Sequence, residues 1–158
     1  MKKSFGALVA LLAAGVLVGC NSNNNNSPPP GTGTNCGGPP SSNQLEVLFP
    51  IPNSRNAPPA LGNVYVSTKG QLPASNQFNL YLVQSNGSST FTSPFFGISE
   101  SKIPTPHAKP TYSNPIYYAS SLPSSYYIGP SQSVAVLWND GGTGCNPHVQ
   151  ISSFKTKS

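Results

Sequence analysis

The segment 145–148 and the nearby Asp140 hold residue types that bind metals. Cys145 and His148 have the spacing of half a structural zinc site, but such a site takes four nitrogen or sulfur ligands. The remaining two would have to come from distant residues such as Cys36 and His107. Calcium takes about six to eight oxygens, usually from several carboxylates, and residues 140–144 supply one. We therefore predict no metal and interpret this glycine-rich segment as a hairpin connection.

The combinations of residues that known catalytic mechanisms require are also incomplete in this sequence. A Ser-His-Asp set can be drawn from His107 or His148 with Asp140, but no serine lies in the sequence context of a nucleophile elbow. Glycoside hydrolysis needs two carboxylates about 5–9.5 Å apart, and the acids are only Glu46, Glu100 and Asp140. We expect that the protein is not an enzyme and needs no cofactor.

Tyrosines form the clearest cluster of candidate binding residues. Five of them fall within residues 112–127, including the adjacent pairs Tyr117/Tyr118 and Tyr126/Tyr127. Tyrosine is enriched at binding surfaces because it offers a large amphipathic area. Adjacent strand residues point to opposite faces of a sheet, so one member of each pair should be exposed or half-exposed. These two pairs are the candidate patch for a glycan or protein ligand, and the alternative is ordinary cross-strand packing.

Short strands must position these residues. Only 7% of residues are charged, while the chain holds 18 prolines and 15 glycines, a composition that favours strands and turns over helices. Apolar residues alternate in short runs, which predicts an all-β sandwich or barrel. The expected strands are 45–49, 63–67, 78–83, 90–96, 115–119, 133–138 and a last one that begins at Val149. Trp138 is expected in the core because its neighbours alternate strictly.

Two irregular places are also expected. Ile151 and Phe154 cannot share a face of a regular strand, so we predict a bulge near residues 152–153. Residues 100–114 contain three prolines and no strand pattern, and we interpret them as a surface loop.

The N-terminal residues indicate export. Lys2 and Lys3 precede an apolar run that extends to Val18, which is typical of a secretory signal. The end of this run, Leu17-Val18-Gly19-Cys20, resembles the lipobox of bacterial lipoproteins. The resemblance implies that residues 1–19 are removed and that Cys20 carries the lipid that holds the protein on a membrane. It also implies a location in the periplasm or at the cell surface.

Residues 20–43 are predicted to be a disordered tether. They are rich in Asn, Pro and Gly and almost free of apolar residues, so nothing offsets the entropy of ordering them. A tether of this length spans about 25 Å. With Cys20 lipidated, Cys36 and Cys145 remain, and in an oxidising exported compartment we expect them to form a disulfide, the alternative being two free thiols.

The globular part, residues 44–158, resembles bacterial Ig-like domains. The resemblance rests on Leu48–Ser54 followed by Val64-Tyr65-Val66-Ser67, on Leu122-Pro123 with Tyr126-Tyr127, and on the closing Ser153-Phe154-Lys155-Thr156. It implies an Ig-like or fibronectin-III-like antiparallel β-sandwich of about seven strands.

Net charge gives little indication of a partner. Without the signal segment, six basic residues stand against three acids, and no basic run predicts nucleic-acid binding. Scattered lysines in solvent are expected, with weak attraction to an anionic surface as the alternative. We therefore expect a membrane-anchored, non-catalytic lipoprotein with a binding or structural role at the cell envelope. The alternatives are a small carbohydrate-binding module that uses its tyrosines and a docking subunit of an envelope complex.

Overall fold

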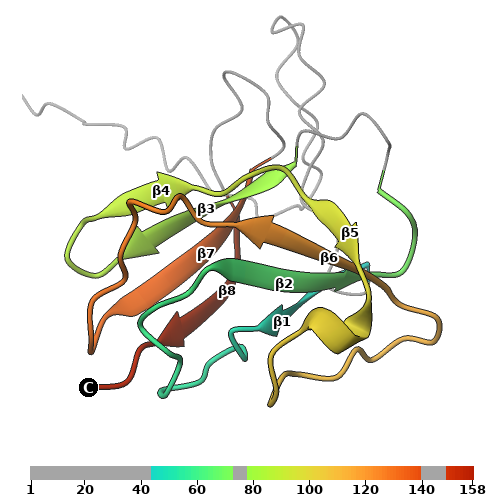
Figure 1. Ribbon diagram of the computed structural model, residues 1–158, viewed down its shortest axis with the longest axis horizontal. Coiled ribbons are helices and arrows are strands. Elements are labelled where there is room, and N and C mark those ends of the chain that lie inside the picture. Colours follow the sequence, from blue (N-terminus) through green and yellow to red (C-terminus); the bar gives the residue numbers. More distant parts are fainter. Residues whose placement is uncertain (1–43, 73–77, 140–148) are drawn as a thin grey trace, which may run out of the picture.

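The described part of the chain is a two-layered β-sandwich (Figure 1). The computed structural model describes residues 44–72, 78–139 and 149–158. One antiparallel sheet has the order β1-β2-β6-β5 and the other the order β4-β3-β7-β8. The strands of the first sheet are β1 (Leu45–Phe49), β2 (Asn63–Thr68), β6 (Ile116–Ser121) and β5 (Phe96–Ile98). Those of the second are β4 (Ser89–Phe91), β3 (Asn79–Gln84), β7 (Ser133–Asn139) and β8 (Val149–Lys155).

This strand order is that of the immunoglobulin fold. In the usual letters, the first sheet is A-B-E-D and the second is C′-C-F-G. The expected Ig-like sandwich is therefore confirmed. The described residues form eight strands where about seven were expected, and β4 is the additional one. No helix among these residues is long and apolar enough to cross a membrane.

The expected strands agree with the observed ones within two residues, with one exception. The expected strand 90–96 is wrong as a single element, because β4 and β5 belong to different sheets and the chain crosses between them. The expected strand 115–119 corresponds to β6, which continues to Ser121.

The core lies between the sheets and consists of the alternating positions. Fully buried aliphatic side chains come from three central strands: Val64, Val66, Leu80, Leu82, Val134 and Val136. Trp138 is 4% exposed, and its ring lies 5.1 Å from the ring of Phe78 and 5.9 Å from that of Phe95, measured between centroids. The expected core position of Trp138 is confirmed.

The bulge in β8 occurs earlier than expected. Val136 pairs with Ser152, but the next residue of β7, Leu137, pairs with Gln150, so Ile151 is the extra residue. The bulge expected near residues 152–153 is confirmed, one residue earlier in the chain. Beyond the bulge Phe154 pairs with Val134 and is buried.

The segment 53–57 covers the outer edge of β8. Prolines at positions 50 and 52 follow β1, and the chain then passes to the second sheet. There, backbone amide groups of Asn53 and Ala57 donate to the carbonyls of Ser153 and Lys155, at 2.8 and 3.0 Å. Ala57 and Thr156 form a parallel bridge, and both are buried. A strand edge open to aggregation is thereby closed.

Thr92 joins the two sheets where the chain crosses between β4 and β5. Its hydroxyl accepts a hydrogen bond from the backbone amide of Leu80 at 2.9 Å and bonds the hydroxyl of Ser120. Leu80 belongs to the second sheet and Ser120 to the first, and both Thr92 and Ser120 are buried. These polar groups satisfy one another in an otherwise apolar layer.

Replacing Thr92 with Val should therefore destabilise the domain at nearly constant side-chain volume. The substitution leaves the buried amide of Leu80 without its acceptor and removes one of the two partners of the Ser120 hydroxyl, which still donates to the Ser93 carbonyl. The free energy of unfolding should fall by about 1–3 kcal/mol. Urea denaturation measures this change. Thr90→Val in neighbouring β4 is the matched control, since the Thr90 hydroxyl is exposed and bonds only the next carbonyl. Equal stability of the two variants would contradict the role of Thr92.

Candidate functional site

Several candidate residues lie outside the described part of the chain. They are Cys20, Cys36, Asp140, Cys145 and His148. The lipid attachment and the disulfide therefore remain predictions from the sequence.

Tyr117 and Tyr118 point to opposite faces of β6, as predicted. Tyr118 pairs with Val66, is buried in the core, and accepts a hydrogen bond on its hydroxyl from the backbone amide of Leu72 at 3.0 Å. Tyr117 pairs with Ser67 and Ile98 on the outer face of the first sheet and is half-buried. Only Tyr117 of this pair is accessible to a ligand.

Tyr126 and Tyr127 lie in the loop between β6 and β7 rather than on a strand. Tyr126 packs against the core, whereas Tyr127 is 64% exposed. The buried Gln84 donates to the Tyr127 carbonyl at 3.0 Å, and the next residue, Ile128, is fully buried. The loop is thus fixed to the second sheet, while Tyr117 lies on the first. Of the four tyrosines, Tyr127 is exposed, Tyr117 and Tyr126 are half-buried, and Tyr118 is buried.

Residues 99–115, here called the strap, cover much of the outer face of the first sheet. The Ala108 amide donates to the Leu48 carbonyl at 3.0 Å, and both oxygens of Glu46 accept bonds from Thr111. The Tyr112 hydroxyl donates to that of Ser67 at 3.0 Å. The expected surface loop indeed contains no strand among its residues. It is held to β1 and β2 rather than projecting into solvent.

The strap also buries apolar groups of its own. Leu48 of β1 and Ile103 of the strap are both buried, and neither belongs to the core cluster between the sheets. A small apolar layer therefore lies outside the sandwich, and its burial adds to the hydrogen bonds that hold the strap.

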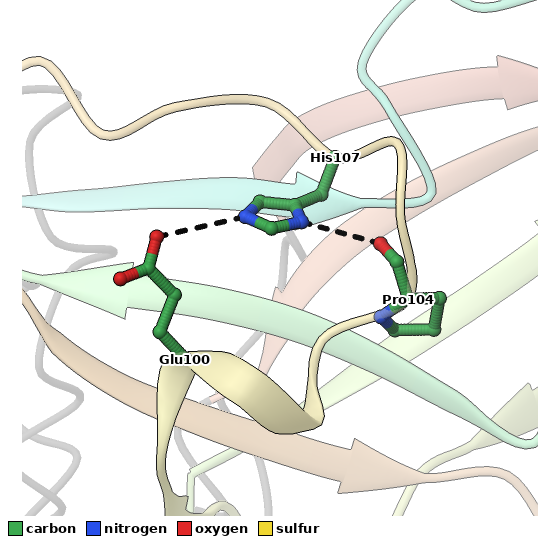
Figure 2. Close-up of polar contacts among 3 residues, drawn as sticks. All are labelled: Glu100, Pro104 and His107. Atoms are coloured by element: carbon green, nitrogen blue, oxygen red, sulfur yellow. Dashed lines mark hydrogen bonds and ion pairs between the residues drawn. The ribbon is translucent and has the colours of Figure 1, made fainter.

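His107 and Glu100 hold the shape of the strap (Figure 2). The imidazole Nδ1 lies 3.2 Å from the carbonyl oxygen of Pro104, which can only accept, so Nδ1 is the donor. On the other side, Nε2 lies 3.8 Å from a Glu100 oxygen. Both partners of His107 belong to the strap itself, within eight residues of one another. In the described ranges, no three His, Cys, Asp or Glu side chains gather as a metal site would require.

The outer face of the second sheet presents aromatic side chains that the sequence interpretation missed. Tyr81 pairs with Phe91 on β4 and with Leu137 on β7, and these three outward residues define what we call the aromatic face. Phe91 is 47% exposed, and its ring centroid lies 4.5 Å from that of Tyr81. The alternation of Phe78, Leu80 and Leu82 toward the core was the available signal, since it places Tyr81 outward.

Polar side chains border the aromatic face. The Tyr81 hydroxyl donates to that of Ser89 at 2.8 Å, and the Asn139 amide donates to the Asn79 carbonyl oxygen at 2.6 Å. Asn79 and Asn139 pair directly across β3 and β7. Rings beside amides and hydroxyls can pack against apolar surface and exchange hydrogen bonds with the same ligand.

Comparison with known proteins adds no relative. No family model matches the chain, and no curated protein or solved structure is significantly similar to it. The class of the protein is therefore defined by its fold, an Ig-like β-sandwich.

Through the ionisation of Tyr112, the stability of the folded domain should depend on pH. Burial raises the pKa of its phenol; the hydrogen bond to Ser67 opposes this rise and the charge of Glu46 adds to it. The folded state thus favours the neutral phenol. Its contribution to stability is complete below the unfolded pKa of about 10 and is lost as pH rises through the raised pKa.

Replacing Tyr112 with Phe should therefore flatten the loss of stability above about pH 10, because position 112 no longer ionises. The measurement is urea denaturation of both proteins at neutral and alkaline pH. Tyr127→Phe, at an exposed position outside the strap, is the control and should follow the parent. An unchanged alkaline slope for Tyr112→Phe would contradict the packing of this phenol between the strap and β2.

Proposed function

We propose that this chain is an exported lipoprotein, anchored through Cys20, whose Ig-like domain has a non-catalytic binding role at the cell envelope. The resemblance of residues 17–20 to a lipobox supports the anchor. The composition of residues 20–43 supports a tether between that anchor and β1.

The observation that carries the binding role is the aromatic face of the second sheet, where two outward rings lie against each other. The strap lies across the outer face of the first sheet and makes hydrogen bonds to β1 and β2. The outer face of the second sheet carries the paired rings of Tyr81 and Phe91, and Phe91 is 47% exposed. An isolated ring of similar exposure, that of Phe96 at 45%, lies on β5 of the first sheet. Exposed aromatic groups with a polar rim are typical of interaction surfaces.

Glu46 and His107, two of the residues considered as catalytic candidates, have structural roles in this domain. Both Glu46 oxygens bind Thr111, and His107 binds the Pro104 carbonyl. These side chains stabilise the strap, which in turn protects β1. A non-catalytic domain is the simplest function for this arrangement.

Substituting Cys20 with Ala should release the protein from the membrane fraction. Without the thiol no diacylglyceryl group can be attached, so the chain should lose incorporation of an alkyne-labelled fatty acid and the corresponding mass. Membrane fractionation and mass spectrometry measure the two effects. Cys36→Ala is the matched control and should keep both label and location. A fatty-acid label retained by Cys20→Ala would overturn the anchor.

A carbohydrate ligand is the second proposal, favoured by the aromatic face rather than by the four tyrosines named from the sequence. The apolar C–H faces of sugar rings pack on aromatic rings, and their hydroxyls bond amides such as those of Asn79 and Asn139. The competing interpretation is a docking subunit of an envelope complex. The two interpretations differ in the ligand, which is a carbohydrate in the first and a protein in the second.

Replacing Phe91 with Ala should weaken polysaccharide binding about tenfold, because it removes the exposed ring of the aromatic face. Affinity electrophoresis in gels containing xylan, hydroxyethyl cellulose, glycol chitin or polygalacturonate measures the effect. Phe96→Ala is a closely matched control, since Phe96 is 45% exposed but belongs to the first sheet. Equal losses from both variants, or mobility unaffected by every polymer, would contradict a carbohydrate surface at this face.

A further inference from the structure

Three of the basic residues meet at one edge of the sandwich. Arg55 belongs to the segment that pairs with β8, and Lys155 and Lys157 lie at the end of β8 and just beyond it. The Lys155 amide donates to the Ser54 carbonyl at 2.7 Å, and its carbonyl accepts from the Ala57 amide at 3.0 Å. Residues 55 and 56 therefore lie directly beside Lys155. We call Arg55, Lys155 and Lys157 the basic edge.

All three side chains of the basic edge point to solvent. Ala57 and Thr156, which pair with each other, face inward and are buried. Alternation then places Lys155 and Lys157 on the outward side, where both are exposed, and Arg55 is exposed as well.

The basic edge has no acidic neighbour to neutralise it within the described residues. Glu46 and Glu100 are the described acids, and they bind Thr111 and approach His107 in the strap region. Among the described residues no Lys or Arg side chain lies within ion-pair distance of Glu46 or Glu100, and the one such neighbour is the His107 imidazole at 3.8 Å from Glu100. Three cations with no Asp or Glu side chain paired to them among the described residues create a positive local potential that attracts anions.

The basic edge and the aromatic face lie on the same side of the second sheet. Lys155 pairs with Ser133 on β7, two residues before Ala135 and four before Leu137. Residues 133, 135 and 137 share the outward face, so Lys155 lies on the face that also carries Tyr81 and Phe91. One side of one sheet thus offers rings at its β4 edge and cations at its β8 edge.

We propose that this side of the second sheet binds an acidic polysaccharide, whose sugar rings contact the aromatic face and whose carboxylates contact the basic edge. The proposal rests on the binding role proposed above and names its ligand class. A polysaccharide is long enough to cross the sheet and alternates apolar ring faces with charges. A lipid headgroup would satisfy the cations alone. The exported location that the signal segment predicts separates the domain from nucleic acids.

The test measures binding of the lipidated protein, held in phosphatidylcholine nanodiscs, to polygalacturonate and to neutral dextran. The parent should bind polygalacturonate and not dextran, and rising salt should weaken the binding because exposed charges are screened. A triple variant, Arg55→Gln with Lys155→Gln and Lys157→Gln, should raise the Kd for polygalacturonate about tenfold.

The matched control neutralises the other three lysines, as Lys69→Gln with Lys102→Gln and Lys109→Gln. It changes the net charge by the same amount and should leave the Kd unchanged. Circular dichroism and thermal melting check that both triples remain folded. Equal losses from the two triples would show that only net charge matters and would overturn the proposal, as would unchanged binding by the basic-edge triple.

Competition identifies the class of partner. Phosphatidylglycerol vesicles or duplex DNA that bind more tightly than polygalacturonate, through the same three residues, would replace the polysaccharide with a membrane or a nucleic acid and overturn the assignment. Phe91-dependent binding of a neutral glycan with no effect of the basic-edge triple would overturn this inference alone. The binding role and the Cys20 anchor would then still stand.

Discussion

The backbone pairing between residues 53–57 and β8 is the interaction on which the rest of the structure depends. A strand that continued straight from β1 would leave the edge of β8 with unpaired amide and carbonyl groups. The two prolines after Phe49 end β1, and the chain then donates and accepts hydrogen bonds along Ser153–Lys157. This single crossover ties the two sheets together, fixes Ala57 against Thr156, and brings Arg55 beside Lys155.

On the first sheet, the strap provides hydrogen-bond partners for the edge strand β1. It offers no regular ladder to β1, so it uses one backbone bond to Leu48, the carboxylate of Glu46 and the phenol of Tyr112. Its polar groups are consequently engaged inward, toward the sheet. The second sheet has its β8 edge closed by the crossover, and its outer face carries the rings of Tyr81 and Phe91.

Local patterns in the sequence were sufficient for the strands and insufficient for the contacts between distant segments. Val134, Val136 and Trp138 alternate so strictly that their burial follows from spacing alone. The crossover at Thr92 could not be recognised, because residues 90–96 have the composition of one strand and change sheets midway. The basic edge could not be predicted either, because it brings together residues that are distant in the sequence. Arg55 and Lys155 are one hundred residues apart, and only the parallel pairing of Ala57 with Thr156 makes neighbours of them.

The charge distribution changes the interpretation of a nearly neutral composition. Counted along the chain, the lysines are few and scattered, and no partner follows from them. In the folded domain the described acids lie with the strap on the first sheet, while three cations lie at the edge of the second. Because opposite charges on separate sheets do not cancel locally, each surface keeps its own potential.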